Sequence, residues 1–126
     1  MLPDVRRLGA VATELGLALA RRGHEVHFIS YDRPARLAGF HPRVTFHRVE
    51  VSSYPLFRYP PYDLALASVM RDVAETSDLD ILHVHYAIPH AASAFLAKEM
   101  LKPSNLPTVT TLHGTDITLV GMMPSF

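Results

Sequence analysis

The sequence contains no cysteine. This excludes disulfides, thiolate metal sites and cysteine nucleophiles, and it fits the cytoplasmic localisation that we expect. The formal net charge is zero with histidine neutral, so we expect no general attraction to nucleic acid or to membrane surfaces. No apolar run approaches the roughly 20 residues of a membrane-spanning helix, and no signal peptide is recognisable at the N-terminus.

Helices and strands are expected to alternate along a chain of 126 residues, which is one domain at most. Apolar residues recur at helical spacing in Gly9–Arg22, Tyr62–Ser77 and residues 89–101. Strand patterns occupy Glu25–Ser30, Val44–Val51, Asp80–His85 and Thr108–Leu112. The alternation predicts βαβ units, and so an α/β fold with a Rossmann-like parallel sheet flanked by helices.

The helical spacing also predicts which side chains face the sheet. Gly16 interrupts the first helix, which predicts close packing there, and Gly23 is expected to end it. The expected inner residues are Val11, Leu15, Ala18 and Leu19 in the first helix, Leu64, Ala67, Ser68, Val69 and Val73 in the second, and Ala92, Phe95, Leu96 and Met100 in the third.

A polar turn, His113-Gly-Thr-Asp116, follows the last predicted strand. Ligands of open parallel sheets bind outside the carboxyl ends of the strands. An imidazole, hydroxyls, a carboxylate and a glycine that lets the backbone approach a ligand suit that position. Thr115 and Asp116 would also serve as a helix N-cap, and the two roles are compatible.

The first strand expected of such a sheet is missing. Residues 1–8 carry three charges and a proline, which argues against a strand. In the common strand order, the first strand would lie between Glu25–Ser30 and Asp80–His85. Its absence would leave backbone groups unpaired, so we expect a fragment, an altered gene product or a strand supplied by another chain.

Five segments together resemble a known family: Gly9–Gly16, Arg22–Asp32, Pro60–Ser68, Leu82–Ala91 and Thr110–Thr118. They are similar to the N-terminal domain of the N-acetyl-α-D-glucosaminyl L-malate synthases of the bacillithiol pathway, which have the GT-B fold and belong to glycosyltransferase family 4. The turn at His113 alone indicates only family 4. The segments His85–Ala91 and Tyr54–Asp63 are more specific.

The resemblance implies transfer of N-acetylglucosamine from UDP-N-acetylglucosamine to L-malate with retention at the anomeric carbon, and no cofactor. His113 would then lie beside the transferred sugar and its phosphate as the catalytic residue. Tyr86 and Thr111 would donate hydroxyl hydrogen bonds to malate carboxylates. Gly9, Gly114 and Thr115 would approach the ligand, and Asp116 would brace the turn. No protein nucleophile is implied.

Two departures from the family matter. Only Gly9 remains of a Gly-Gly-Ser-Gly-like turn, and Leu8 stands in place of its serine. The nucleotide-sugar domain is also absent, so residues 1–126 would be an incomplete acceptor-side domain. We therefore expect no transferase activity from this polypeptide alone, and the sequence leaves the oligomeric state open.

Other interpretations remain beside this one. His83 and His85 could share one side of a strand with His90 and His113 nearby, but this is weak evidence for a metal site, and we expect His83 to be a hydrogen-bonded core residue. The tyrosines Tyr54, Tyr59 and Tyr62 would pack the loop or cover the acceptor. A non-catalytic domain that binds a dicarboxylate or pairs with a separate donor chain is the main alternative function. A dinucleotide-binding dehydrogenase ranks last, because the sequence has no Gly-x-Gly-x-x-Gly turn.

Overall fold

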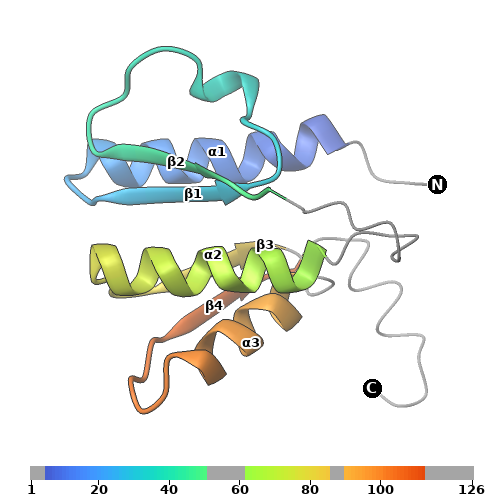
Figure 1. Cartoon of the computed structure of the whole chain (residues 1–126). Coiled ribbons are helices and arrows are strands. Elements are labelled where there is room, and N and C mark those ends of the chain that lie inside the picture. The colour runs from blue at the N-terminus through green and yellow to red at the C-terminus, as the bar shows by residue number, and fades with distance from the viewer. Residues whose placement is uncertain (1–4, 51–61, 86–89, 113–126) are drawn as a thin grey trace. The chain divides into compact units, whose positions relative to one another are not determined.

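The computed structural model describes residues 5–50, 62–85 and 90–112, and it has an α/β architecture (Figure 1). The chain divides into two compact units, Met1–Glu50 and Val51–Phe126. Each unit contains one pair of parallel strands: β1 (Val26–Ser30) with β2 (Val44–Arg48), and β3 (Leu82–His85) with β4 (Thr108–Thr111). The predicted combination of parallel strands and flanking helices is confirmed.

In the first unit, helix α1 (Val5–Arg21) packs on the strand pair through a glycine. A Cβ atom built on Gly16 would lie 2.2 Å from the Cζ atom of Phe28. The predicted close packing at this glycine is therefore confirmed. Phe28 lies opposite Phe46 in the register, so both side chains are on the face of the sheet toward α1. The connection between the strands contains the short 3₁₀-helix η1 (Ala35–Leu37), whose Leu37 is buried.

The predicted inner stripe of α1 is wrong. Val11 is 49% exposed and Leu15 is 39% exposed, whereas the smaller residues Thr13, Gly16 and Ala20 are buried. Gly16 faces the sheet because the ring of Phe28 occupies the space that a side chain at this position would need. The buried residues of α1 are Thr13, Gly16, Leu17 and Ala20.

In the second unit, two helices, α2 (Tyr62–Ser77) and α3 (Ala92–Met100), contact each other. Leu82 and Val84, which share one face of β3, are buried. Of the predicted inner residues of α2, Ala67 and Val73 are buried as expected, whereas Leu64 is 58% exposed and Ser68 is also exposed. The buried side chains of α2 are Leu66, Ala67, Met70 and Val73.

Small residues also form the inner face of α3. Ser93, Ala94 and Ala97 are buried, whereas Ala92 is exposed, Phe95 is 63% exposed and Met100 is 40% exposed, so these three predicted core positions are wrong. Small side chains let neighbouring helices approach closely, which fits the contact between α2 and α3.

The two longest helices end in the same way. Gly23 has φ +98°, and the N–H of His24 donates to the carbonyl of Leu19 over 3.2 Å. At the end of α2, Asp78 has φ 50°, and the N–H of Leu79 donates to the carbonyl of Ala74 over 3.3 Å. Both are left-handed caps in which a hydrogen bond closes the last turn. The predicted end of the first helix at Gly23 is confirmed.

The predicted strands differ from the observed ones mainly at their ends. β1 and β4 match within one residue, β3 begins at Leu82, and β2 ends at Arg48. Residues 5–8 are helical, which agrees with the expectation that they form no strand, and α1 begins four residues before the predicted start. Gly9 therefore lies inside a helix rather than in a turn before it. The predicted loop 52–61 lies outside the described residues.

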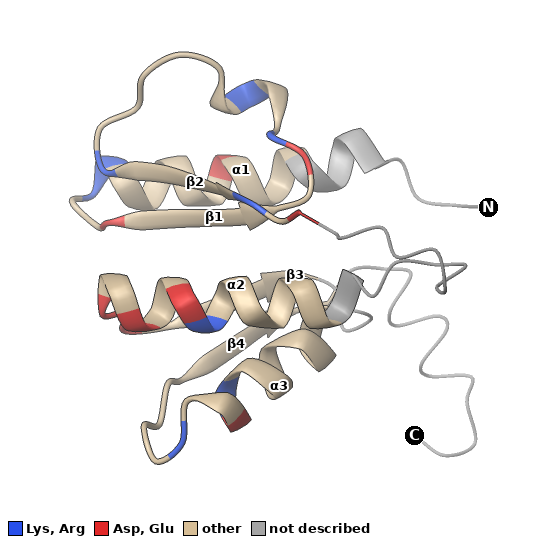
Figure 2. Ribbon diagram, in the orientation of Figure 1, with Lys and Arg blue, Asp and Glu red and all other residues tan. Residues whose placement is uncertain are grey.

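Charged residues of both signs occur in each unit, whereas the strands β1, β3 and β4 carry none (Figure 2). None of the helices in residues 5–50, 62–85 and 90–112 has the length and apolar character needed to cross a membrane.

Candidate functional site

The carboxyl ends of β3 and β4 lie side by side. His85 and Thr111 are the last residues of these strands, and they are partners in the parallel register. Tyr86 follows His85 in sequence, and His113 comes two residues after Thr111. The structure therefore brings together the two strand ends that precede the predicted site segments, at the edge where α/β sheets bind ligands.

An imidazole and a hydroxyl meet across these strands. His83 Nε2 lies 2.6 Å from Thr111 Oγ1, which is hydrogen-bonding distance. His83 has Val109 as its register partner, so the contact runs diagonally to the residue two positions farther along β4. The hydrogen bond expected for His83 is confirmed, but its core location is wrong because the side chain is exposed.

Two further histidines lie at this edge. The rings of His83 and His85 have centroids 4.7 Å apart and planes inclined by 12°, which confirms that both lie on one side of the strand. His90 Nδ1 lies 2.5 Å from the carbonyl oxygen of His85. A carbonyl only accepts, so Nδ1 of His90 carries the proton. This hydrogen bond ties the start of the following helical segment to the end of β3.

These groups are suited to binding an anion through hydrogen bonds. Imidazole N–H groups and a threonine hydroxyl are donors, and donors to a carboxylate make the stronger, charge-assisted class of hydrogen bond. Among the residues that the structure describes, no three or more His, Asp or Glu side chains form a group that could hold a metal ion.

Of the predicted site residues, only Thr111 has a described side chain, and it lies at this edge. Gly9 is in α1, in the other unit. The remaining predicted site residues lie outside the described residues: Tyr86, His113, Gly114, Thr115 and Asp116. Their roles stay predictions.

The first unit contains an imidazole pair that the sequence analysis missed. His27 Nδ1 and His47 Nε2 are 2.9 Å apart. The ring centroids are 5.1 Å apart, about the N···N distance plus the two ring radii, so the rings meet nearly end to end. Burial, and then the neighbouring His27, lower the pKa of His47. The sequence places one histidine on each of these two adjacent strands, but only the observed register shows that the two rings meet, on the face of the sheet away from Phe28.

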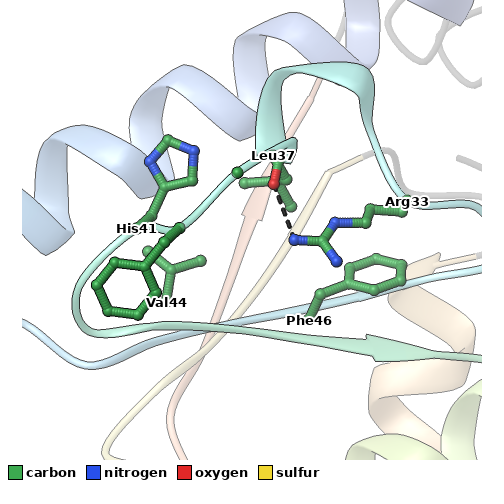
Figure 3. Close-up of a pocket in the computed structure, with 7 residues that line it drawn as sticks. Arg33, Leu37, His41, Val44 and Phe46 are labelled. Atoms are coloured by element: carbon green, nitrogen blue, oxygen red, sulfur yellow. Dashed lines mark hydrogen bonds between the residues drawn. The ribbon is translucent and has the colours of Figure 1, made fainter.

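A small hollow of about 110 Å³ lies in the β1–β2 connection (Figure 3). Arg33 donates from Nη2 to the carbonyl of Leu37 over 2.9 Å, and its guanidinium lies 5.9 Å from the ring centre of Phe46. His41 Nε2 and Thr108 Oγ1 are the buried side-chain polar atoms without a hydrogen-bond partner in the described part of the chain. Arg33 is thus already held by the protein, and the second polar side chain that lines the hollow is His41.

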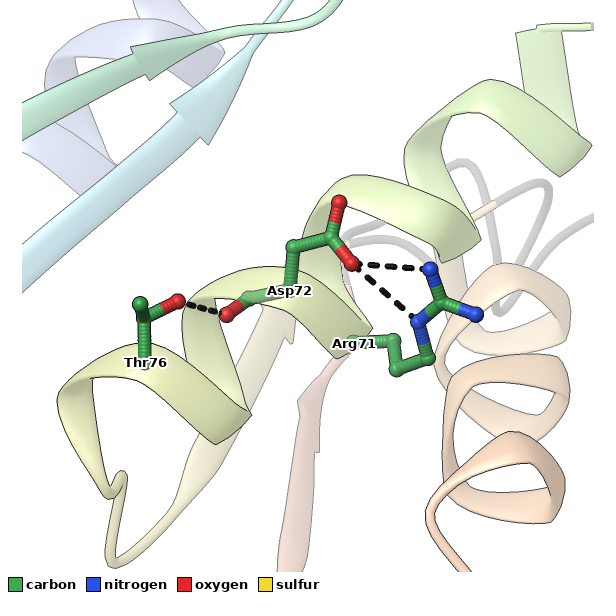
Figure 4. A network of polar contacts seen from close by, with 3 residues as sticks. All are labelled: Arg71, Asp72 and Thr76. Carbon is green, nitrogen blue, oxygen red and sulfur yellow. Dashed lines mark hydrogen bonds and ion pairs between the residues drawn. The ribbon is translucent and has the colours of Figure 1, made fainter.

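A polar network on α2 is a surface feature (Figure 4). Arg71 donates to one carboxylate oxygen of Asp72 from Nε at 3.1 Å and from Nη2 at 2.8 Å, and the hydroxyl of Thr76 donates to the backbone carbonyl of Asp72. The hydrogen bond to Asp72 raises the pKa of the exposed Arg71, which is a cation in any case. Such exposed neighbouring pairs contribute little to stability.

Comparisons with known proteins identify relatives of the chain. The model of the family described as Glycosyltransferase Family 4 matches residues 8–125. The N-acetyl-alpha-D-glucosaminyl L-malate synthase of Bacillus anthracis is 58% identical over 123 residues, which are 98% of this chain and 32% of that protein. An uncharacterized glycosyltransferase of Methanocaldococcus jannaschii is 28% identical over 92 residues, which are 73% of this chain and 24% of that protein. The chain thus spans a third or less of the length of these relatives.

Proposed function

The chain belongs to glycosyltransferase family 4, and we propose that it forms the acceptor-binding part of an enzyme that transfers N-acetylglucosamine from UDP-N-acetylglucosamine to L-malate. The observation that carries this proposal is the 58% identity with the L-malate synthase of Bacillus anthracis, which extends over nearly the whole chain. The product would be the intermediate with which bacillithiol biosynthesis begins, in the cytoplasm.

The edge formed by β3 and β4 supports acceptor binding. Thr111 places a hydroxyl at the end of β4, and His83 and His85 place imidazoles beside it. In the proposed enzyme, Tyr86 and Thr111 hold the malate carboxylates and so orient the hydroxyl that attacks the sugar. Holding the two reactants in one geometry removes much of the entropic barrier to a bimolecular transfer.

The chemistry of transfer requires the second half of the enzyme. The diphosphate leaving group accumulates negative charge as its bond to the sugar breaks, and His113 would donate a hydrogen bond there. We assign no protein nucleophile; the donor phosphate would accept the proton of the malate hydroxyl, and the sugar would be transferred with retention. A chain without the donor-binding part would bind malate but turn nothing over.

Titration of the 126-residue chain with L-malate tests acceptor binding. We expect amide chemical-shift changes at His85 and Thr111, and weaker changes with succinate, which has no hydroxyl. Thr111→Val should weaken binding about tenfold or more, because a hydrogen bond to a charged group is worth about 1.5–3 kcal/mol. Thr110→Val is the matched control, since Thr110 is exposed and its side chain points to the other face of β4. Equal effects of the two substitutions would contradict the assignment of Thr111.

An activity assay tests the division of labour. UDP release that depends on both substrates should be undetectable with the chain alone, and it should appear when a donor-binding domain of the family is fused or added. Release by the chain alone would refute the predicted inactivity. Malate binding without transfer after the donor domain is added would favour a non-catalytic dicarboxylate-binding domain instead.

A further inference from the structure

The direction of the hydrogen bond between His83 and Thr111 decides what the threonine hydroxyl can offer to a ligand. A hydroxyl has one hydrogen to donate and two lone pairs to accept with. If Thr111 donates to His83 Nε2, only its lone pairs face the ligand, and these repel a carboxylate. If Thr111 accepts from His83 Nε2–H, its own hydrogen remains available for an anionic group.

We propose that His83 is a positioning residue that donates its Nε2–H to Thr111 Oγ1 and so turns the threonine hydroxyl hydrogen toward a carboxylate of the acceptor. This inference rests on the proposed function, which gives Thr111 an anionic ligand. At 2.6 Å the contact is short, so the two groups are in direct contact without an intervening water.

The surroundings hold both partners in place. The ring of His83 lies nearly parallel to that of His85, with centroids 4.7 Å apart, which limits its rotation. Threonine is branched at Cβ, so its χ1 angle is restricted in a strand and its oxygen has a defined position. The main freedom left to the hydroxyl is the rotation of its hydrogen, and the donor on His83 removes the orientation that would point this hydrogen at the imidazole.

Three variants distinguish a His83 that donates a hydrogen bond through Nε2 from a His83 that only packs against its neighbours. His83→Leu removes the donor, whereas His83→Gln places an amide N–H at about the distance of Nε2 from the backbone. We expect His83→Leu to raise the dissociation constant of L-malate about tenfold and His83→Gln to change it less than threefold. Thr111→Val added to His83→Leu should cause little further loss, because the two residues act through one hydroxyl. The exposure of His83 predicts that all variants fold, and the amide spectrum of β3 and β4 verifies it.

The tautomer of His83 is the direct readout. Long-range ¹H–¹⁵N NMR of the chain should show a proton on Nε2 with the ring neutral. An unprotonated Nε2 in the neutral ring, or a His83→Gln variant as weak as His83→Leu, would overturn the proposal while leaving malate binding intact. Absence of malate binding by the unmodified chain would instead refute the proposed function, and this inference with it.

Discussion

The two units of the chain share one diagonal contact across their strand pairs and differ in the residue that receives it. In each unit, the second residue of the first strand is a histidine that reaches diagonally to the fourth residue of its parallel partner. In the first unit the diagonal partner of His27 is another imidazole, His47, and in the second unit the partner of His83 is the hydroxyl of Thr111. The same backbone register thus supports two different chemistries.

The difference shows that the partner residue, rather than the histidine, sets what each contact can do. Two imidazoles that meet end to end share one hydrogen between two nitrogens, so a second bound proton breaks the contact. An imidazole that meets a hydroxyl leaves a hydrogen for a third group. The first arrangement responds to protons, and the second is suited to a ligand.

The units also differ in their helices: α2 of the second unit buries the large side chain of Leu66, whereas α1 of the first unit approaches its strands at Gly16. The largest expected effect tests this difference. In the second unit, Leu66 of α2 is 2% exposed, so Leu66→Ala should lower the free energy of unfolding by about 2–5 kcal/mol. Leu64→Ala, two residues away and 58% exposed, is the matched control and should change it by less than about 0.5 kcal/mol. Urea unfolding measures both, and amide hydrogen exchange should place the loss in β3 and β4. Equal effects would contradict the observed orientation of α2.

Within the described residues, a close approach at a glycine occurs in the first unit, at Gly16. Gly16→Ala places a methyl group where the ring of Phe28 lies, so we expect a loss of about 1–3 kcal/mol. The double variant Gly16→Ala with Phe28→Leu, measured by the same unfolding experiment, should recover part of the loss relative to the sum of the single changes. Additive losses would mean that the ring moves aside at no cost.

Element types could be predicted from the sequence, but the orientations of the helices could not. The strands at Val26–Ser30 and Thr108–Thr111 and the helix at Tyr62–Ser77 follow from local patterns of apolar residues. The predicted helix faces place the large apolar residues inward, whereas α3 buries small residues and α1 buries small residues beside Leu17. That outcome depends on distant partners such as Phe28, which no local pattern contains.

The candidate site was predictable only in part for the same reason. A turn rich in polar residues after a strand indicated where ligands would bind, and Thr111 was found from its family resemblance. The contact of His83 with Thr111, by contrast, depends on the register between β3 and β4. A shift of one residue would turn the two side chains to opposite faces, so neither the pair nor its counterpart at His27 could be predicted before the register was known.

The C-terminal ends of α1 and α2 offer a smaller test of the comparison between the two units. Gly23 and Asp78 occupy equivalent left-handed positions, but only glycine adopts that conformation without strain. Gly23→Ala should cost about 1 kcal/mol, since its added Cβ meets no other atom and only the backbone is strained. Asp78→Gly should stabilise the second unit by about 0.5–1 kcal/mol. Thermal unfolding of the two variants checks both signs, and a destabilised Asp78→Gly would show that the aspartate side chain supports the turn.

The smallest expected effect is a dependence on pH that the imidazole pair produces. The pKa of His47 is lowered in the folded chain by burial and by His27, so the unfolded state binds more protons between that value and the ordinary pKa of about 6.5. Stability contributed by the pair is therefore complete above pH 6.5 and declines as the pH falls toward the folded pKa. His47→Thr copies the arrangement of the second unit and removes the titrating group. Urea unfolding measures the difference in stability between the unmodified chain and this variant. We expect that difference to shrink as the pH falls from 7.5 to 5.5. A difference that stays constant would show that a second proton does not weaken the contact between His27 and His47.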